Sequence, residues 1–262
     1  MPYLSRITIY PIKSLDGVDV TTAKITPGGA LQFDRRFAIF DSQGKHINGK
    51  NNAAIHCLRS TFDLVANTIT LTAPEIPEPT SFDLEHDLSA LTAWLSTYFQ
   101  TSAQIQENPT HGFPDDIKAS GPTIFSQSSL KAVSEWFPDL DSPEISRRMR
   151  ANLEITDTNP ATPFWEDCLF GKKDSPKEFS IGDVKFLGAY PCSRCIVPTR
   201  DSQTGEAYPQ FQKIFSQRRQ ETLTAGVQRS PFNHFYRFTV NTIIPATESG
   251  KILHLGDEIK LR

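Results

Sequence analysis

The spacing of apolar side chains predicts short strands in the first third of the chain. Residues Tyr3–Tyr10 alternate between apolar and polar positions, as in a strand with one buried face. Arg36–Asp41 and Ile69–Thr72 are similar short runs bounded by turn residues. Three closely spaced prolines then follow, namely Pro74, Pro77 and Pro79. Because proline has no backbone N–H donor, we expect a stiff surface connection without regular structure there.

Helical spacing appears in three later places. The first helix is expected from apolar residues at helical intervals, which are Leu88, Leu91, Leu95 and Phe99. Asp87 is its expected N-cap. A second helix is expected over Ser126–Phe137, where Pro138 ends it. A third is indicated by Phe211, Ile214, Phe215 and Arg218.

The rest of the second half is rich in predicted strands. Gly182-Asp183 and Gly256-Asp257 each lead into an alternating run, a pattern typical of tight hairpins or corners. No regular alternation of strand and helix is present, which disfavours a doubly wound sheet. The fold class is therefore predicted to be mainly β (α+β) with a few packed helices, and the loop-like run Asn108–Asp116 suggests a domain junction.

Composition narrows the possible partners and location. The 262 residues carry 27 Lys and Arg against 30 Asp and Glu, a net charge of −3, so we expect no nucleic-acid coating. No stretch approaches the roughly 18 apolar residues of a membrane span. The first residues become polar at once, without the apolar segment of a signal peptide. We therefore expect a cytoplasmic protein with no membrane span, whose cysteines are thiols or ligands.

The pair Cys192 and Cys195 is the strongest chemical signal. Such a pair can ligate zinc, exchange disulfides or present one activated thiolate. Zinc requires two further ligands, and Pro198 disrupts the helix that follows a redox pair in many exchange proteins. The adjacent Arg194 favours a thiolate that binds a soft or high-valent metal. The alternative that both cysteines are small buried apolar residues stays open.

Three further motifs bring cations to candidate strands. Lys13 and Ser14 follow the first strand and could bind a phosphate. In Asp34-Arg35-Arg36, strand alternation predicts that one arginine faces inward and needs an anion. Arg150 and Asn152 are two residues apart, so a strand would place both on one face. Each motif alone is also compatible with a solvated surface.

Together, these motifs resemble the MOSC family, including its amidoxime-reducing components and YcbX-type reductases. The matching segments are Tyr10–Ser14, Asp34–Arg36, Met149–Leu153, Cys192–Cys195, and then Thr199, Asp201 and Thr204-Gly205. The resemblance implies an N-terminal MOSC β-barrel-like domain over residues 1–107 and a MOSC β-barrel domain over residues 108–262.

The resemblance also implies a molybdopterin-type molybdenum cofactor. Cys195 would be the metal ligand and catalytic residue, and Lys13, Ser14 and Arg35 would hold the cofactor phosphate. Arg150 and Asn152 would meet the phosphate or the pterin edge. The metal pocket would be lined by Ser193 and Arg194.

The implied activity is the reduction of N-hydroxylated small molecules by a molybdenum-dependent oxidoreductase. The protein would supply metal coordination, access and polarity. We expect electrons from a separate donor protein of reductase, ferredoxin or cytochrome type. Two alternatives remain, a persulfide (sulfur) transfer protein and a non-enzymatic carrier of the molybdenum cofactor.

Overall fold

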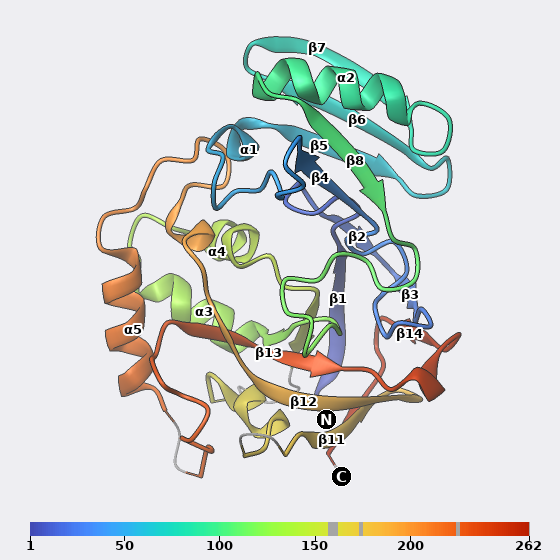
Figure 1. The fold of residues 1–262 in the computed structure, drawn as a ribbon. Coiled ribbons are helices and arrows are strands. Elements are labelled where there is room, and N and C mark those ends of the chain that lie inside the picture. The colour runs from blue at the N-terminus through green and yellow to red at the C-terminus, as the bar shows by residue number, and fades with distance from the viewer. Residues whose placement is uncertain (157–161, 173–174, 224–225, 262) are drawn as a thin grey trace.

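The computed structural model describes residues 1–156, 162–172, 175–223 and 226–261. Their main element is an eight-stranded sheet (Figure 1). Its strands, in spatial order, are β15 (Ile259–Leu261), β11 (Lys177–Ile181), β12 (Val184–Ser193), β13 (Arg237–Ile243), β9 (Ile124–Ser126), β10 (Leu153–Thr156), β1 (Tyr3–Ile9) and β2 (Val18–Val20). Neighbouring strands are antiparallel except β9 and β10, which are parallel.

The two ends of this sheet meet, so that it forms a barrel. The N–H of Leu4 in β1 donates to the carbonyl of Asp257, just before β15, at 2.9 Å. An isolated bridge also joins Tyr3 and Glu258. β2 pairs with the other half of the same edge of β1. The first and last strands therefore close the barrel, whose interior is filled by apolar side chains of nearly every strand.

A second, smaller unit lies above the barrel in Figure 1 and has its own apolar core. We call it the small unit, and it comprises β4 (Phe37–Asp41), α1 (Ala54–Cys57), β5 (Arg59–Asp63), β6 (Thr68–Ala73), β7 (Ile76–Asp83), α2 (Leu88–Phe99) and β8 (Ala103–Glu107). β5, β6 and β7 form one sheet, and β4 pairs with β8. The apolar face of α2, with Leu91 and Leu95 fully buried, supplies much of this core.

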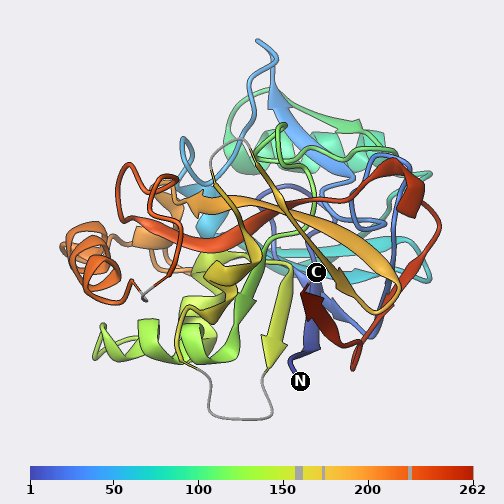
Figure 2. The same cartoon turned by 90° about the horizontal axis from the view of Figure 1, so that it is seen from below.

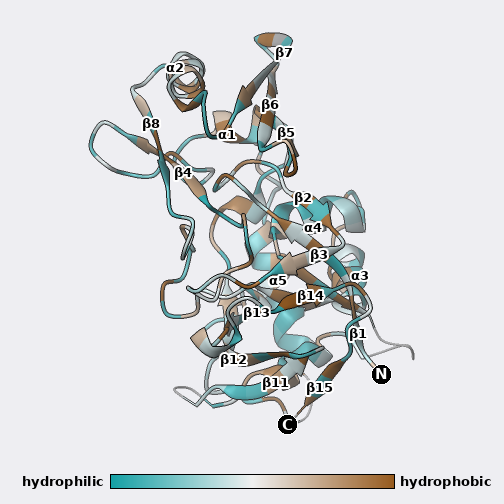
Figure 3. Ribbon diagram, turned by 90° about the vertical axis from the view of Figure 1, so that its right-hand side faces the viewer, coloured by the Kyte–Doolittle hydropathy of each residue, from teal (hydrophilic) through white to brown (hydrophobic). Residues whose placement is uncertain are grey.

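Three α-helices gather on one side of the barrel (Figure 2), namely α3 (Gln127–Glu135), α4 (Ser142–Met149) and α5 (Phe211–Glu221). An aromatic core joins these three helices to the barrel, with Phe137 stacked on Phe211 at 4.3 Å between ring centroids. Short 3-10 turns form at η1 (Trp165–Leu169), η2 (Val197–Thr199) and η3 (Ala246–Glu248). A two-stranded sheet of β3 (Thr22–Lys24) and β14 (Ile252–His254) completes the fold. Figure 3 shows the apolar residues of the barrel strands, including β12 and β15.

The predicted mainly β, α+β architecture with a few packed helices is confirmed, and so are the three predicted helices. β1 and β2 pair within the barrel sheet, while β4–β8 form the small unit. The proposed domain boundary between residues 107 and 108 stays a prediction. None of the helices in the described ranges has the length and hydropathy needed to span a bilayer.

Three local predictions are wrong for identifiable reasons. The segment with the prolines contains β7, which is an edge strand and therefore needs hydrogen-bond donors on one side only. By contrast, Asp87 does occupy the predicted N-cap position of α2, although its side chain makes no hydrogen bond to the helix. Arg35 lies in a turn before β4, and Arg150 ends α4, so neither arginine lies on a strand. Both have positive φ, at 48° and 50°, which regular strands do not use.

The two Gly-Asp turns differ. Gly182-Asp183 joins β11 to β12 in a hairpin. Gly256-Asp257 joins β14 to β15, which pair with different strands, so it makes a corner. The sequence pattern allowed both forms, and the pairing partners of the flanking strands distinguish them.

Candidate functional site

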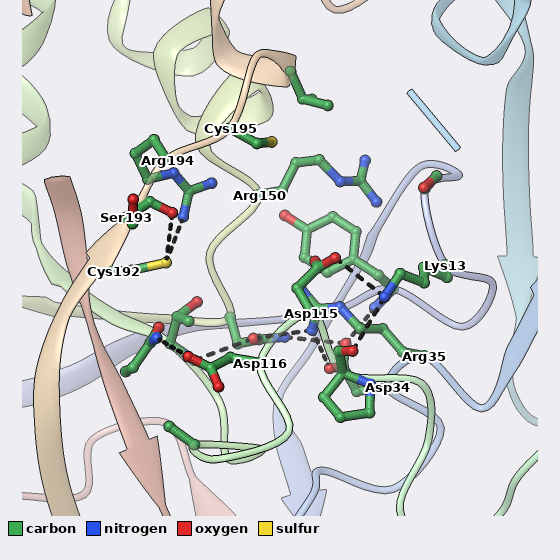
Figure 4. A pocket seen from close by; sticks show the side chains of 18 of the residues that line it. Lys13, Asp34, Arg35, Asp115, Asp116, Arg150, Cys192, Ser193, Arg194 and Cys195 are labelled. Carbon is green, nitrogen blue, oxygen red and sulfur yellow. Dashed lines mark hydrogen bonds and ion pairs between the residues drawn. The ribbon is translucent and has the colours of Figure 1, made fainter. Parts of the chain in front are cut away.

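A cavity of about 1170 Å³ is lined by residues of both the barrel and the small unit. The eight residues singled out from the sequence all line it, although they come from four separate segments (Figure 4). They are Lys13, Ser14, Arg35, Arg150, Asn152, Ser193, Arg194 and Cys195. The fold therefore brings the predicted site residues together.

The charge of this cavity differs from that of the whole chain. Twelve Lys and Arg residues line it, against five Asp residues, although the net charge of the protein is −3. Positive charge focused in a concave site raises the local concentration of anions. The cavity is therefore suited to an anionic ligand.

Lys13 lies at one side of the cavity, just after β1, and only 7% of its surface is exposed. Its ammonium donates to the carbonyls of Phe113 and Pro114 at 2.9 and 3.2 Å and forms an ion pair with Asp115 at 3.1 Å. Burial lowers the pKa of Lys13 more than the neighbouring carboxylate raises it. An incoming phosphate would therefore have to share or replace contacts that this loop provides.

Asp115 and Asp116 were missed in the sequence analysis, which treated them only as part of a loop. Partial burial tends to raise the pKa of Asp115, but Arg35, Lys13 and Lys50 outweigh it and hold the pKa below its usual range. Asp116 accepts a hydrogen bond from the Tyr190 hydroxyl at 2.7 Å, on the barrel side. The only hint in the sequence was that two carboxylates stand side by side in the loop that joins the two units. Such a pair can balance the positive charge of the Lys and Arg residues that line the cavity.

Arg35 is held by a buried polar cluster beside β1. Its guanidinium pairs with Asp34 and reaches the Asn152 side-chain oxygen at 3.4 Å. Asp34 also accepts from the Tyr10 backbone N–H and from the Asn152 amide. Asn152 is 1% exposed, and it accepts further from the Thr123 N–H. Its amide is thus engaged with protein groups and positions Arg35.

Arg150 has a different environment from Arg35. Its guanidinium lies 4.3 Å from the centroid of the Tyr10 ring and donates to the carbonyl of Leu15. Burial lowers the pKa of Arg150. Within the described ranges no carboxylate forms an ion pair with it. Partial burial of a guanidinium without a counter-ion costs free energy, so this position favours an external anion.

Cys195 lies between β12 and η2, is partly exposed and lines the cavity. In Figure 4 its thiol points into the same space as Arg150, while Cys192 lies on the other side of Arg194. Arg194 donates to the sulfur of Cys192 at 3.3 Å and to the carbonyl of Met149. Burial tends to lower the pKa of Arg194, but the nearby Cys192 and Cys195 outweigh this and raise it.

Cys57, Cys192 and Cys195 are free thiols. The described part of the chain contains no group of three or more His, Cys, Asp or Glu residues able to hold a metal ion. A zinc site made of protein ligands alone therefore has no support there. The partly exposed Cys195 also differs from a fully buried structural thiol.

The segment after Cys195 is fixed by a second polar cluster. Asp201 accepts from the backbone N–H groups of Gln203 and Thr204, which closes a tight turn. It also pairs with the buried Arg148 at 3.2 Å, and Arg148 pairs with Glu144 on the same helix. These residues hold the Cys195 segment against α4. Neither Arg148 nor Glu144 was predicted to belong to the site, because a strand was expected around Arg150 and no helix was expected before it.

Ser193 and its surroundings complete the other side of the cavity. The Ser193 hydroxyl is 2.9 Å from Nε2 of His234. Arg237, in β13, donates to the carbonyl of Pro191 and to the side chain of Asn233. Burial lowers the pKa of His234, and the charge of Arg237 lowers it further.

Two family models match the chain, the MOSC N-terminal beta barrel domain over residues 1–140 and the MOSC domain over residues 119–260. Similar proteins include molybdenum cofactor sulfurase 2 of Culex quinquefasciatus, which is 23% identical over 78% of this chain and 31% of its own length. Mitochondrial amidoxime-reducing component 1 of Homo sapiens is 22% identical over 77% of this chain and 67% of its own length. Component 2 of Bos taurus is 25% identical over the same shares.

The sulfurases and the amidoxime-reducing components differ in the share of their own length that this chain covers. The chain spans less than a third of the mosquito sulfurase and about two thirds of the amidoxime-reducing components. The two family models together extend from residue 1 to residue 260, and each matches more than half of the chain. The chain therefore belongs to the MOSC family and combines the family's N-terminal β-barrel domain with a MOSC domain.

Proposed function

We propose that this protein is a molybdenum-cofactor-dependent oxidoreductase that reduces N-hydroxylated small molecules. The observation that carries the proposal is that the Cys195 thiol lines the same cation-rich cavity as Lys13, Ser14 and Arg35. A thiolate suits a high-valent metal, and the cations suit a phosphorylated pterin. The similarity to the amidoxime-reducing components supports the reaction class.

The residues present fit such a cofactor. Arg150 is partly buried and has no carboxylate partner in the described ranges, and Nε of Arg194 is buried without a hydrogen-bond partner. Both guanidiniums line the cavity and would be satisfied by an anionic, hydrogen-bonding ligand. The cavity volume of about 1170 Å³ leaves room for a substrate as well.

The cofactor, when bound, supplies the two-electron chemistry at an N–O bond. Cys195 would ligate the metal. Lys13, Ser14 and Arg35 would hold the phosphate, with Asn152 keeping Arg35 in place through Asp34. Arg150 would meet the phosphate or the pterin edge.

Further residues would shape the metal pocket and deliver electrons. Ser193 and Arg194 would line this pocket, and Arg194 also donates to the sulfur of Cys192. A separate donor protein of reductase, ferredoxin or cytochrome type would supply the electrons. We place the protein in the cytoplasm as part of the same proposal.

The decisive test uses Cys195→Ser protein produced in a host that makes the cofactor. We expect its molybdenum content, measured by elemental analysis, to fall to a small fraction of the wild-type value, because a serine hydroxyl is a far poorer soft ligand than a thiolate. Cys57→Ser is the matched control, since Cys57 does not line the cavity. Full molybdenum content and N-reductase activity in the Cys195 variant would remove the ligand assignment.

Sulfur transfer is the second candidate, because molybdenum cofactor sulfurases are among the similar proteins. A partly exposed thiol beside Arg194 could also carry a persulfide. Mass spectrometry of freshly purified protein separates the two functions. A stable gain of about 32 Da, one sulfur, without molybdenum favours transfer. Tight cofactor binding without reductase activity, whatever the electron donor, favours the carrier role.

A further inference from the structure

One carboxylate oxygen lies between two lysine ammoniums at the cavity wall. Oδ1 of Asp115 is 3.1 Å from Nζ of Lys13, as the dashed line in Figure 4 marks, and 3.7 Å from Nζ of Lys50. All three residues line the cavity. Lys50 lies in a turn between β4 and α1, where its N–H donates to the Asn48 side chain at 2.9 Å. The Asp115 oxygen thus has the surroundings that an oxygen of a phosphate group needs.

The contacts of Lys13 show which of them a ligand can replace. A lysine ammonium has three donors. Those of Lys13 are directed to the carbonyls of Phe113 and Pro114 and to the Asp115 carboxylate. The loop backbone that carries the two carbonyls is itself fixed, since the Phe113 N–H donates to the carbonyl of Arg35 at 2.8 Å. A ligand oxygen can therefore take the place of the carboxylate while both carbonyl contacts remain.

The next residue holds the same loop on its other side. The Asp116 carboxylate accepts from the Tyr190 hydroxyl at 2.7 Å and from the Asn241 amide at 3.3 Å. Tyr190 lies on β12 and Asn241 on β13, so both partners belong to the barrel. Because the loop is held at Phe113 and at Asp116, exchange with a ligand requires only that the Asp115 side chain rotates away.

Exposure distinguishes Asp115 from Asp34, the other carboxylate of this cluster. The Asp115 side chain is 56% exposed, so water can solvate it when it leaves the lysines. An ion pair with this exposure contributes little to stability. Asp34 is 8% exposed and accepts hydrogen bonds from the Tyr10 N–H and the Asn152 amide. Its removal would leave buried donors unpaired. Asp115 is therefore the carboxylate that a ligand can displace.

The balance of charge at this point favours a doubly charged anion over the carboxylate. Lys13 and Lys50 carry two positive charges and face one carboxylate, while Arg35 has its own partner in Asp34. A phosphate monoester carries roughly 1.5 to 2 negative charges at neutral pH. It therefore balances both lysines, whereas Asp115 balances one.

We propose that Lys13 and Lys50 together bind a phosphate group, and that the Asp115 carboxylate occupies this place until the phosphate displaces it. Lys50 is thereby assigned as a phosphate-binding residue and Asp115 as an internal competitor of the ligand. The inference rests on the proposed function only for the identity of the phosphate, which would be that of the pterin cofactor. If Asp115 instead positioned Lys13 for its ligand, removal of the carboxylate would have the opposite effect on affinity.

The first test measures phosphate affinity in the absence of the cofactor. Full-length protein from a host that cannot make the cofactor is titrated with inorganic phosphate by calorimetry, at one fixed low ionic strength. We expect Asp115→Asn protein to bind phosphate about five- to tenfold more tightly than wild type, because no ion pair is broken and no displaced carboxylate repels the ligand. Lys50→Gln protein should bind about tenfold more weakly, because one charge-assisted contact is lost.

Three variants control this measurement. Asp116→Asn makes the same change of charge at the neighbouring residue, which forms no ion pair with either lysine in the described ranges, so the affinity should stay within about twofold of wild type. Lys118→Gln removes another cavity-lining cation, and among the described residues Lys118 forms no ion pair with Asp115. Asp115→Glu keeps the charge and should stay close to wild type, which separates loss of the competitor from misfolding.

The sign of the effect decides between the two roles of Asp115. Weaker phosphate binding by Asp115→Asn protein would show that Asp115 positions Lys13, and it would overturn the proposal. An unchanged affinity, or an equal gain in Asp116→Asn protein, would overturn it as well. Equal losses in Lys50→Gln and Lys118→Gln proteins would remove the assignment of Lys50.

The second test asks whether the displacing phosphate is that of the cofactor. Wild-type and Asp115→Asn proteins from a cofactor-producing host are dialysed, and the molybdenum that remains is followed by elemental analysis. We expect the variant to lose molybdenum at least about twofold more slowly, because no carboxylate competes for the lysines. Equal rates would overturn the assignment of this site to the cofactor phosphate. Wild-type protein without molybdenum would contradict the proposed function, while the phosphate titrations would still decide the exchange at Asp115.

Discussion

Arg150 has a conformation that suits glycine better than arginine. It ends α4 with φ at 50°, in the left-handed region, and its partly buried guanidinium has no carboxylate partner in the described ranges. Both features cost stability, on the order of 1 kcal/mol or more for the backbone conformation alone. Ligand binding therefore explains an arginine at this position better than folding does.

The unfavourable backbone conformation of Arg150 leads to a prediction that can be compared with a matched control. Arg150→Gly should lower phosphate affinity by about tenfold, because a charge-assisted contact is lost, while the free energy of unfolding does not fall by more than about 1 kcal/mol. Gln100→Gly, at the equivalent end of α2 with φ at 51°, should stabilise without changing phosphate binding. Titration calorimetry and urea denaturation measure the two quantities. A large loss of stability in Arg150→Gly would assign a structural role instead.

Residue types and motif order were enough to predict which side chains line the cavity, but not how they reach it. Arg35 and Arg150 were expected to face inward through strand alternation, whereas both use positive φ in turns. Asp115 was missed because its role depends on a loop that crosses between the two units, and no local pattern encodes that path. The roles of the eight residues in binding remain predictions.

At the scale of single elements, periodicity predicted the long helices and the well-bounded strands. α2 and α3 carry several buried apolar residues at helical spacing, so their pattern dominates local alternatives. α4 spans only eight residues and buries just two apolar side chains, Ile145 and Met149, which are too few to reveal a helix from apolar spacing. The sequence nonetheless contains a signal for the first residue of α4. Asp141 precedes Pro143 and Glu144 in the order typical of a helix N-terminus.

The cap of α4 can be tested directly. The Asp141 carboxylate accepts from the N–H of Glu144 at 2.7 Å, so Asp141→Ala should destabilise the protein by about 1 kcal/mol. Asp87 occupies the same position before α2 without such a bond to the helix, and Asp87→Ala should cost less than about 0.5 kcal/mol. Urea denaturation compares the two. Equal losses would show that the cap bond is not what stabilises α4.

For the whole molecule, the sequence indicated the class but not the topology. The barrel depends on pairings between strands far apart in the chain, such as β1 with β10 and the parallel pair β9 and β10. Most of these strands are short, and short apolar runs do not specify their partners. The prediction of a barrel therefore came from the family resemblance, because the spacing of apolar residues alone could not predict it.

A pH dependence of global stability follows from His56. Since burial lowers its pKa in the folded protein, the unfolded chain takes up the proton first, and stability is lost as the pH falls below about 6.5. Asp167 acts in the opposite direction, because burial raises its pKa to about 6. The comparison is therefore made between wild type and His56→Gln, by urea denaturation at pH 7.5 and 5.5. The wild type should lose more stability, or gain less, on acidification, and identical pH dependence would contradict this.

The closure of the barrel has a consequence for synthesis on the ribosome. β1 leaves the exit tunnel first, but part of its edge pairs with the backbone beside β15, which emerges last. Until then, that edge is open to pairing with other chains, a hazard of unprotected strands. The small unit has a local core and could fold earlier. We therefore expect nascent chains to depend on chaperones mainly while the barrel waits for its final strand.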